Sequence, residues 1–352
     1  MELKEAVQGR IFHNIQACAE SLGLRAFVIG GFVRDSLLPW RNQHGKDIDI
    51  VVEGRGIELA QAFGKRMRAR QVHIFKNYGT AMVQVGEVSV EFVGARKESY
   101  NRNSRKPIVE EGTLEEDQLR RDFTINALSI SLNKDSFGQL HDPFSGMDDL
   151  ESGIIRTPTD PSITFSDDPL RMMRAIRFAT QLGFFIEPGT FEGIVQNRER
   201  IEIVSKERIA DELNKIILAD RPSVGFHLIE QTGLLSILFP ELENMKGIDY
   251  VNGRGHKDNF LHTLKVLDNV AEKSDNLWLR WVAILHDIAK PLTKRYEKQH
   301  GWTFHGHEDR GARMVPKIFR RMKLPLNEHM KYVQKLVKLH QRPIALVNAK
   351  VT

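Results

Sequence analysis

A pair of glycines directly after a short apolar stretch is the feature that most constrains the fold of this chain. Residues 26–29 predict a buried strand, and Gly30 and Gly31 follow it at once, before a helix start that carries Arg34. Glycine lets the backbone turn sharply and approach a ligand closely. Free N–H groups at the start of a helix favour an anion such as a phosphate. A Gly-Gly pair alone is usually only a turn, so the prediction of a phosphate site depends on the neighbouring segments of the chain.

Two aspartates lie at the start of the next predicted strand, over residues 48–52. Asp47 and Asp49 are two residues apart, so on a strand their side chains project from the same face. Such a carboxylate pair suits hard cations such as Mg²⁺. Two such ions activate an attacking hydroxyl and stabilise a leaving pyrophosphate. An Asp-x-Asp pair alone is often a solvated strand end, but together with the glycine turn it favours nucleotidyl transfer.

Composition and length bound the remaining possibilities. The chain has 352 residues, which predicts two or more domains. A net charge of +5 is compatible with a polyanionic partner. The one cysteine, Cys18, excludes an internal disulfide and fits a reducing compartment. Apolar runs are too short for a membrane helix, and the acidic N-terminus does not resemble a secretory signal. We therefore expect a cytoplasmic protein with no membrane partner.

Hydrophobic periodicity predicts the elements around these motifs, as helices over residues 1–24 and 57–69 and strands over residues 72–75, 80–85 and 88–92. Glu91 lies on the last of these strands. It is either a third carboxylate of the metal site or a solvent-facing strand residue.

Residues 94–113 are polar and basic and have no periodicity. They predict a mobile loop, which is either functional or a surface insertion.

Two adjacent arginines follow this segment. Arg120 and Arg121 suit the clamping of a triphosphate, because guanidinium groups match phosphate oxygens. Asp122 and Asn126 are four residues apart, so on a helix they would share a face and could grip a ribose.

Four blocks together resemble the signature motifs of a known family. They are Gly30–Asp35, Asp47–Asp49, Arg120–Ala127 and Asp142–Gly146. In this order they are similar to the motifs of class II tRNA nucleotidyltransferases, the CCA-adding enzymes and their bacterial poly(A) polymerase relatives. The resemblance is collinear and continues through residue 220.

This resemblance implies an α+β fold with three regions. Residues 1–145 should form a polymerase-beta-like nucleotidyltransferase head with a small mixed sheet. Residues 146–250 should form an all-helical neck and body, and residues 251–352 a helical HD region. Relatives usually carry a longer tail, so either the chain is shortened or the tail is absent.

The resemblance also assigns base selection to the segment Asp167-Asp168-Pro-Leu-Arg171. Relatives usually have Glu-Asp-x-x-Arg, in which the second acid and the arginine pair with the Watson–Crick edge of the incoming nucleotide. Those two positions are Asp168 and Arg171 here. From local sequence alone, Asp168 is a good helix N-cap and Pro169 suits the first helical position.

Further basic residues lie on the predicted neck helices: Arg174, Arg177, Arg198 and Arg200. They are either contacts to the tRNA acceptor backbone, which position RNA without reading its sequence, or part of a solvated face. Residues 207–217 resemble the next family block, a helix that supports the base-reading site.

A second cluster of candidate residues begins near residue 256. His286 and Asp287 are adjacent within an apolar helical run, and other histidines flank them. This pattern resembles the HD phosphohydrolase domain, which implies that His262, His286 and Asp287 bind a divalent transition metal. His307 and His340 are further candidates, and the later Asp of the usual pattern has no clear counterpart. The region is therefore either a metal site or a scaffold for tRNA.

The resemblance implies template-independent addition of C, C and A to the 3′ end of tRNA from CTP and ATP. Asp47 and Asp49 would hold Mg²⁺, and Glu91 would be a third catalytic residue. The nucleotide would be bound by Gly30, Gly31, Arg34, Arg120, Arg121, Asp122, Asn126, Asp168, Arg171, Arg174 and Arg177. Alternatives are CC-only, A-only or poly(A) addition, an HD phosphohydrolase with an inert head, or a protein that only binds RNA. The loop over residues 94–113 is expected to move when specificity changes from C to A. The oligomeric state stays open.

Overall fold

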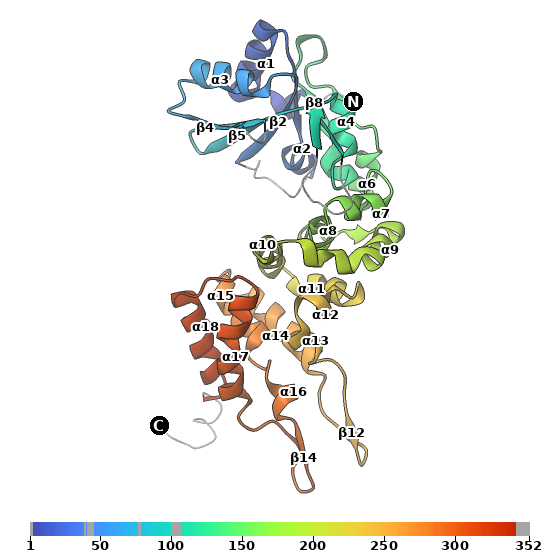
Figure 1. Cartoon of the computed structure of the whole chain (residues 1–352), viewed down its shortest axis with the longest axis vertical. Helices are drawn as coiled ribbons and strands as arrows, with labels where there is room; N and C mark the ends of the chain where they lie inside the picture. Colours follow the sequence, from blue (N-terminus) through green and yellow to red (C-terminus); the bar gives the residue numbers. More distant parts are fainter. Residues whose placement is uncertain (1–2, 39, 41–45, 77–78, 100–107, 343–352) are drawn as a thin grey trace. The chain divides into compact units, whose positions relative to one another are not determined.

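A computed structural model describes residues 3–38, 40, 46–76, 79–99 and 108–342 of the chain (Figure 1). The chain divides into two compact units, residues 1–168 and 169–352. Each unit has buried apolar side chains that form a core of its own.

The first unit is built on a seven-stranded sheet in the order β3-β4-β5-β2-β1-β8-β9. Strands β2 and β5 pair in parallel and the other neighbours pair antiparallel, so the expected mixed sheet is confirmed. The strands are β1 (Arg25–Ile29), β2 (Asp47–Glu53), β3 (Val72–Phe75), β4 (Thr80–Val85), β5 (Val88–Gly94), β8 (Ser129–Ser131) and β9 (Leu140–His141).

Helices α1 and α3 lie over one face of this sheet (Figure 1). Phe92 on β5 points to that face, where its ring lies 5.4 Å from the ring of Phe63 on α3. Helix α1 begins one residue after Gly9 and ends before Gly23, which has a φ of +63°. The expected helix over residues 1–24 is therefore split, with a separate 3-10 turn before Gly9. The helices of the unit are η1 (Lys4–Val7), α1 (Arg10–Leu22), α2 (Gly31–Ser36), α3 (Gly56–Met67), α4 (Leu114–Leu119), α5 (Thr124–Ala127), η3 (Lys134–Ser136), α6 (Gly146–Ser152) and α7 (Pro161–Asp167).

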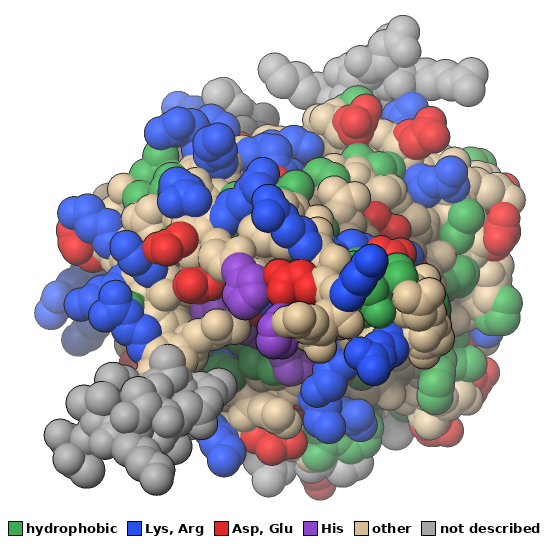
Figure 2. Space-filling view, turned by 90° about the horizontal axis from the view of Figure 1, so that it is seen from below, with side chains coloured by type: hydrophobic (Ala, Val, Ile, Leu, Met, Phe, Trp, Pro, Cys, Tyr) green, Lys and Arg blue, Asp and Glu red, His purple; other side chains and the backbone are tan. Residues whose placement is uncertain are grey.

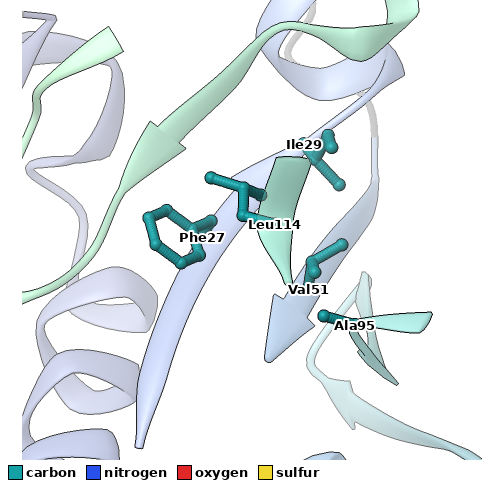
Figure 3. Packing of buried hydrophobic residues seen from close by; sticks show 5 residues of the cluster. All are labelled: Phe27, Ile29, Val51, Ala95 and Leu114. Carbon is teal, nitrogen blue, oxygen red and sulfur yellow. The ribbon is translucent and has the colours of Figure 1, made fainter. Parts of the chain in front are cut away.

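The opposite face of the sheet is covered by α4. Figure 3 shows Leu114, the first residue of α4, packed with Phe27, Ile29, Val51 and Ala95 in a buried cluster. A capping box also starts this helix, in which the side chains and backbone N–H groups of the N-cap residue and the third helical residue bond each other. Because residues of β2 alternate between faces, Val51 shares its face with Asp49. Helix α4 is therefore anchored on the carboxylate-bearing face.

The expectation of an unstructured loop over residues 94–113 is wrong for the part that the structure describes. A hairpin forms there, in which β6 (Arg96–Ser99) pairs antiparallel with β7 (Ile108–Glu111). Ala95 N–H donates to the Val52 carbonyl at 2.6 Å and the Ala95 carbonyl accepts from Gly112 N–H at 2.9 Å, which ties the hairpin base to the sheet. These are backbone bonds, so side-chain periodicity did not reveal them. Residues 100–107 lie outside the described residues.

The second unit consists mainly of helices, and the α+β fold class expected for the whole chain is confirmed. Two short hairpins, β12–β13 and β14–β15, interrupt the helices. The elements are α8 (Leu170–Leu182), β11 (Phe185–Ile186), α9 (Pro188–Asn197), η4 (Arg198–Ile203), α10 (Lys206–Ile217), α11 (Pro222–Gln231), α12 (Leu234–Leu238), α13 (Pro240–Glu243), β12 (Tyr250–Val251), β13 (Arg254–Gly255), α14 (Asn259–Ala271), α15 (Leu277–Leu285), α16 (Lys290–Thr293), β14 (Arg295–Glu297), β15 (Gly301–Thr303), α17 (His307–Arg321) and α18 (Glu328–Leu339).

The expectation that Asp168 caps the next helix is wrong by one residue. Helix α8 begins at Leu170 and its N-cap residue is Pro169. Asp168 is instead the C-cap residue of α7, a helix that Asp160 caps at its other end. The reason is that residues 161–167 form a helix of their own, which the apolar pattern did not separate from the one after it.

A buried arginine joins three segments of the second unit. Arg280 on α15 is 2% exposed. Its guanidinium donates to the carbonyls of Ile217, the last residue of α10, and of Ala219, at 2.8 and 2.7 Å. It also donates to the carbonyls of Ala271, the last residue of α14, at 3.2 Å and of Ser274 at 2.9 Å. One side chain therefore satisfies carbonyls that two helix ends leave without intrahelical partners.

Replacing Arg280 by Met should destabilise the second unit by about 3 kcal/mol, because buried carbonyls lose charged donors. Urea unfolding followed by tryptophan fluorescence measures this, since Trp281 is the next residue. The matched control is Arg320→Met, which removes an exposed arginine of α17. An Arg280→Met midpoint equal to that of the control would contradict the role of Arg280.

Candidate active site and metal centre

Three carboxylates project from one face of the sheet in the first unit. Asp47 and Asp49 lie two residues apart on β2. Asp49 is paired in register with Glu91 on the parallel strand β5. The structure thus brings all three predicted catalytic residues to one place. Among the described residues, however, these three do not form a set whose oxygens all lie within 4.8 Å of one another.

The pKa of the Glu91 carboxyl depends on its burial and on the charged groups of this face. Burial raises the pKa of its carboxyl, and the neighbouring Asp49 carboxylate raises it further, whereas Arg96 and Arg121 act in the opposite direction. The raised pKa therefore has two main causes, burial of the carboxyl and the nearby Asp49 carboxylate. A divalent cation would relieve the repulsion between the carboxylates, and Mg²⁺ commonly uses one or two protein carboxylates together with water and substrate phosphates.

Gly30 lies where the glycine turn meets these carboxylates. It has a φ of +80°, a conformation that side-chain-bearing residues rarely adopt. A Cβ at this position would lie 3.4 Å from Asp49 Oδ2 and 3.4 Å from Arg121 Nη1. The backbone angle therefore favours glycine here, and the two oppositely charged side chains lie within van der Waals contact of the position that a Cβ would take. The next residue, Gly31, begins α2.

The predicted arginine pair is held by a carboxylate that the sequence analysis did not single out. Asp117 on α4 is completely buried. Its Oδ1 accepts from Arg120 Nε at 3.0 Å, and its Oδ2 accepts from Arg121 Nη2 at 3.0 Å. Burial alone would raise the pKa of Asp117, but Arg121 and Arg120 outweigh burial and hold that pKa below its usual range. The sequence offered one indication of these ion pairs, because Asp117 precedes the two arginines by three and four residues, a spacing at which helical side chains interact.

The predicted ribose-binding pair is in contact, although not for the expected reason. Asp122 lies outside a helix, and Asn126 belongs to the short helix α5. Asn126 Nδ2 nevertheless donates to Asp122 Oδ1 at 3.0 Å. Arg34 is 5% exposed and donates from Nη1 to Asn126 Oδ1 at 2.8 Å. Its Nε also donates to Asp35 Oδ1 at 2.8 Å. The Arg34 side chain is therefore fixed and orients the amide of Asn126.

The predicted base-reading residues belong to different units. Asp168 ends the first unit, and Arg171 lies in the first turn of α8 in the second. Their joint role therefore stays a prediction.

The basic residues of the neck are partly engaged within the second unit. Arg177 Nε lies 2.8 Å from Glu212 Oε2, and the Arg177 side chain is 12% exposed. The guanidinium groups of Arg177 and Arg174 lie 4.1 and 5.4 Å from the ring centre of Phe178. Glu212 belongs to α10, the helix expected to support this region. The charges of that helix are thus not all on a solvated face.

Four histidines of the second unit converge on Asp287, which is 2% exposed. Its Oδ2 lies 3.1 Å from His286 Nε2 and 3.7 Å from His262 Nε2. Its Oδ1 lies 3.2 Å from His307 Nε2 and 3.7 Å from His340 Nε2. On the face seen in Figure 2, histidine side chains gather in a hollow with Lys and Arg side chains around them. The five candidate ligands thus form two groups of three that share Asp287.

Backbone hydrogen bonds orient three of these rings. The Nδ1 atoms of His286, His307 and His340 each lie 2.7 Å from the carbonyl three residues earlier. An Nδ1–H that donates to a carbonyl leaves Nε2 with its lone pair, which is the form that binds a metal. A set of imidazole nitrogens with a carboxylate suits a divalent transition metal. The residues present therefore fit the metal that the sequence predicted.

Among the described residues, the groups that could hold a metal contain no acid other than Asp287, and His307 and His340 complete the second group of three. The histidines also act on Asp287. Burial would raise its pKa, but when no metal is bound and Nε2 also carries a proton, hydrogen bonds from His286, His307 and His340 hold that pKa far below its usual range. Lys290 Nζ lies 2.7 Å from Asp287 Oδ2 and was not predicted. The only sequence feature that indicated this contact was the position of Lys290, three residues after Asp287.

Across the part of the chain that the structure describes, no helix has both the length and the apolar character needed to span a bilayer.

Comparison with known families matches three regions of the chain. Residues 26–156 match the poly(A) polymerase head domain, and residues 259–349 match the HD domain. Residues 183–246 match a region described as a probable RNA- and SrmB-binding site of polymerase A.

Two curated relatives illustrate the similarity. A multifunctional CCA protein of Shewanella frigidimarina is 32% identical over 314 residues, which cover 87% of this chain and 71% of the relative. An A-adding tRNA nucleotidyltransferase of Aquifex aeolicus is 39% identical over 265 residues, which cover 75% of this chain but 31% of the relative. Among solved structures, the apo form II of a CCA-adding enzyme is similar with a TM-score of 0.69 at 25% identity, covering 100% of this chain and 77% of that one.

The histidine cluster should bind a transition metal such as Mn²⁺ or Ni²⁺ and thereby raise the melting temperature of the second unit, because a ligand that binds only the folded state stabilises it. Thermal unfolding with and without the metal measures the shift. His286→Ala should remove the shift, whereas His305→Ala, which replaces an exposed histidine outside the cluster, should retain it. An equal shift in both variants would contradict this assignment.

Proposed function

The chain belongs to the family of poly(A) polymerases and CCA-adding tRNA nucleotidyltransferases, and from this premise we propose that it completes the CCA end of tRNA. As a nucleotidyltransferase it uses CTP and ATP, transfers one nucleotide at a time to the tRNA 3′ end and releases pyrophosphate. No nucleic-acid template is needed. A cytoplasmic location belongs to the same proposal, because tRNA and nucleoside triphosphates are the substrates. The division at residues 145 and 250 into head, neck with body, and HD region is retained as a proposal.

The observation that carries the proposal is the place of Asp49. It lies beside Glu91 in the β2–β5 register and close to both Gly30 and Arg121. A triphosphate at the glycine turn would have its negative charge facing Arg121 and its alpha-phosphate near the carboxylates. In the reaction, the 3′-hydroxyl oxygen of tRNA bonds to the alpha-phosphorus and its proton is lost to solvent. The bond from that phosphorus to the bridging oxygen breaks, and pyrophosphate leaves.

We propose that Asp47 and Asp49 hold Mg²⁺, with Glu91 as an additional oxygen ligand. Oxygen donors alone match the preference of this ion, and the Asp49 carboxylate, which after burial is the next cause of the raised pKa of Glu91, is a negative charge that it would offset. When bound, Mg²⁺ supplies charge stabilisation for the attacking oxygen and the leaving group. The protein fixes the carboxylates on one face of two paired strands, so their positions do not depend on loop order.

The arginine pair would bind the phosphates of the incoming nucleotide. Asp117 holds both guanidinium groups from the buried side, so their positions are set before a ligand arrives. A bidentate arginine binds phosphate with directional, charge-assisted bonds. Prior orientation of both arginines reduces the entropy lost when the nucleotide binds. Asp122 and Asn126 would hold the ribose, and their mutual hydrogen bond fixes the amide for that purpose.

Base selection would come from Asp168 and Arg171, which offer an acceptor and a donor to the base edge. Arg174, Arg198 and Arg200 would contact the tRNA acceptor backbone. Arg177 would do so only by exchanging its ion pair with Glu212 for a phosphate, so we assign it to support of the neighbouring residues first. The hairpin β6–β7 carries the segment that we propose to move when specificity changes from C to A.

Addition of A alone is the second candidate. The observation in its favour is the 39% identity to the A-adding relative, a higher value than the 32% identity to the multifunctional CCA protein. The histidine cluster is proposed to hold a second divalent metal of transition type, at His262, His286 and Asp287 with His307 and His340.

A tRNA lacking its CCA end, incubated with labelled CTP, with ATP and with both, should be extended by two C residues with CTP alone and completed by A with both. Gel analysis of product length measures this. Extension only of tRNA that already ends in CC would favour A addition, and a long A tail would favour poly(A) addition.

Asp47→Asn should reduce incorporation at least about a thousandfold, because several kcal/mol of transition-state stabilisation is lost. Retained incorporation in Asp47→Asn would exclude the proposed centre.

Asp117→Asn should raise the KM for CTP about tenfold while the protein stays folded, because the two arginines lose their fixed orientation. Steady-state incorporation kinetics measure KM, and circular dichroism checks the fold. The control is Glu115→Gln, which removes an exposed acid from the same helix. Equal KM values for the two variants would show that Asp117 does not position the clamp.

A further inference from the structure

A cavity of about 380 Å³ opens beside the hairpin β14–β15 in the second unit. Its wall combines this hairpin with the end of α16 and the first turns of α17. The polar residues that line it, apart from one acid, are Arg295, Arg310, Arg313, Thr293, Thr303 and His305. Its volume is within the range of small-molecule sites. None of its residues belongs to the proposed nucleotide site or to the histidine cluster.

Three arginines line this cavity without a carboxylate partner. Arg310 Nη1 donates to the carbonyl of Leu292 at 3.0 Å, which anchors its side chain at the rim. Within residues 108–342, neither Arg295, Arg310 nor Arg313 forms an ion pair with an acid. Exposed arginines on proteins commonly pair with nearby acids, so three that converge without one mark a site of positive potential.

The acids in and near the cavity already have other partners. Glu297 lines the cavity, but its Oε1 accepts from Thr303 Oγ1 at 3.1 Å and lies 3.9 Å from His305 Nε2. Glu308 Oε2 lies 3.5 Å from His307 Nδ1, and Asp309 Oδ1 lies 3.5 Å from Lys338 Nζ. The lining therefore has three positive groups against one carboxylate, a net positive charge.

We propose that this cavity binds a phosphate group. Guanidinium forks match phosphate oxygens in geometry as well as charge, so the three arginines are the donors that would hold it. The cavity is concave and carries few apolar side chains, so a compact anion fits it better than an apolar ligand. The phosphate belongs either to a small phosphomonoester or to the backbone of an RNA. Phosphate binding here is independent of nucleotide addition by the first unit.

The test compares the full chain with two double variants. Arg295→Ala with Arg313→Ala removes two exposed charges from the cavity wall. Lys298→Ala with Lys317→Ala removes two exposed charges from the same hairpin region and the same helix, outside the wall. Both variants lose equal charge, so a difference between them reports the cavity and not the general field of the protein.

In the first arm, inorganic phosphate is titrated and its binding is followed by the broadening of its ³¹P resonance. The arginine variant should bind phosphate about tenfold more weakly than the full chain, and the lysine variant should bind it unchanged. This result, with unchanged tRNA binding, assigns the cavity to a small phosphomonoester.

In the second arm, binding of tRNA is measured by filter retention over a range of salt concentrations. If the cavity holds backbone phosphate, the arginine variant should lower the slope of log K against log salt by about 1.8, for two lost contacts. Identical behaviour of the two variants in both arms would overturn the proposal. A chain that binds phosphate in the cavity but adds no nucleotide would refute the proposed function alone.

Discussion

The electrostatic balance on one face of the seven-stranded sheet is the constraint on which the first unit depends. Asp47, Asp49 and Glu91 place like charges on neighbouring strands, and burial together with the Asp49 carboxylate raises the pKa of Glu91. Arg121 supplies part of the opposing charge and is itself held by Asp117. Like charges this close are tolerated in the free protein only with such a counterbalance. The same surplus of negative charge makes the face suitable for a divalent cation.

Packing explains why these charges meet. Leu114 anchors α4 on the sheet face that carries Asp49, and Asp117 follows one turn later in the buried side of that helix. The arginines just past the helix end therefore arrive beside Gly30 and Asp49. A hydrophobic cluster of ordinary composition thus determines the geometry of the charged site. Loss of that packing would misplace the arginines without changing a single charged residue.

The second unit is also organised around a buried carboxylate, but with different partners. One buried carboxylate, Asp287, again organises several cationic or polar partners, here imidazole rings whose Nδ1 atoms are tied to backbone carbonyls. Imidazole favours transition metals, whereas the oxygen-only face of the first unit favours Mg²⁺. The two centres therefore differ in the ions they suit. The basic cavity at β14–β15 adds a third polar feature that neither centre requires.

The local sequence determined the elements and the chemical types of the site. The glycine turn, the Asp47–Asp49 strand and the adjacent arginines were predictable because alternation, turn residues and charge spacing are short-range properties. Three arrangements were decided only by the tertiary structure. They are the pairing of Asp49 with Glu91, the orientation of both arginines by Asp117, and the meeting of four histidines at Asp287. The β6–β7 hairpin was missed because its order comes from backbone pairing. Register and helix packing join residues distant along the chain, and no local pattern encodes which of them meet.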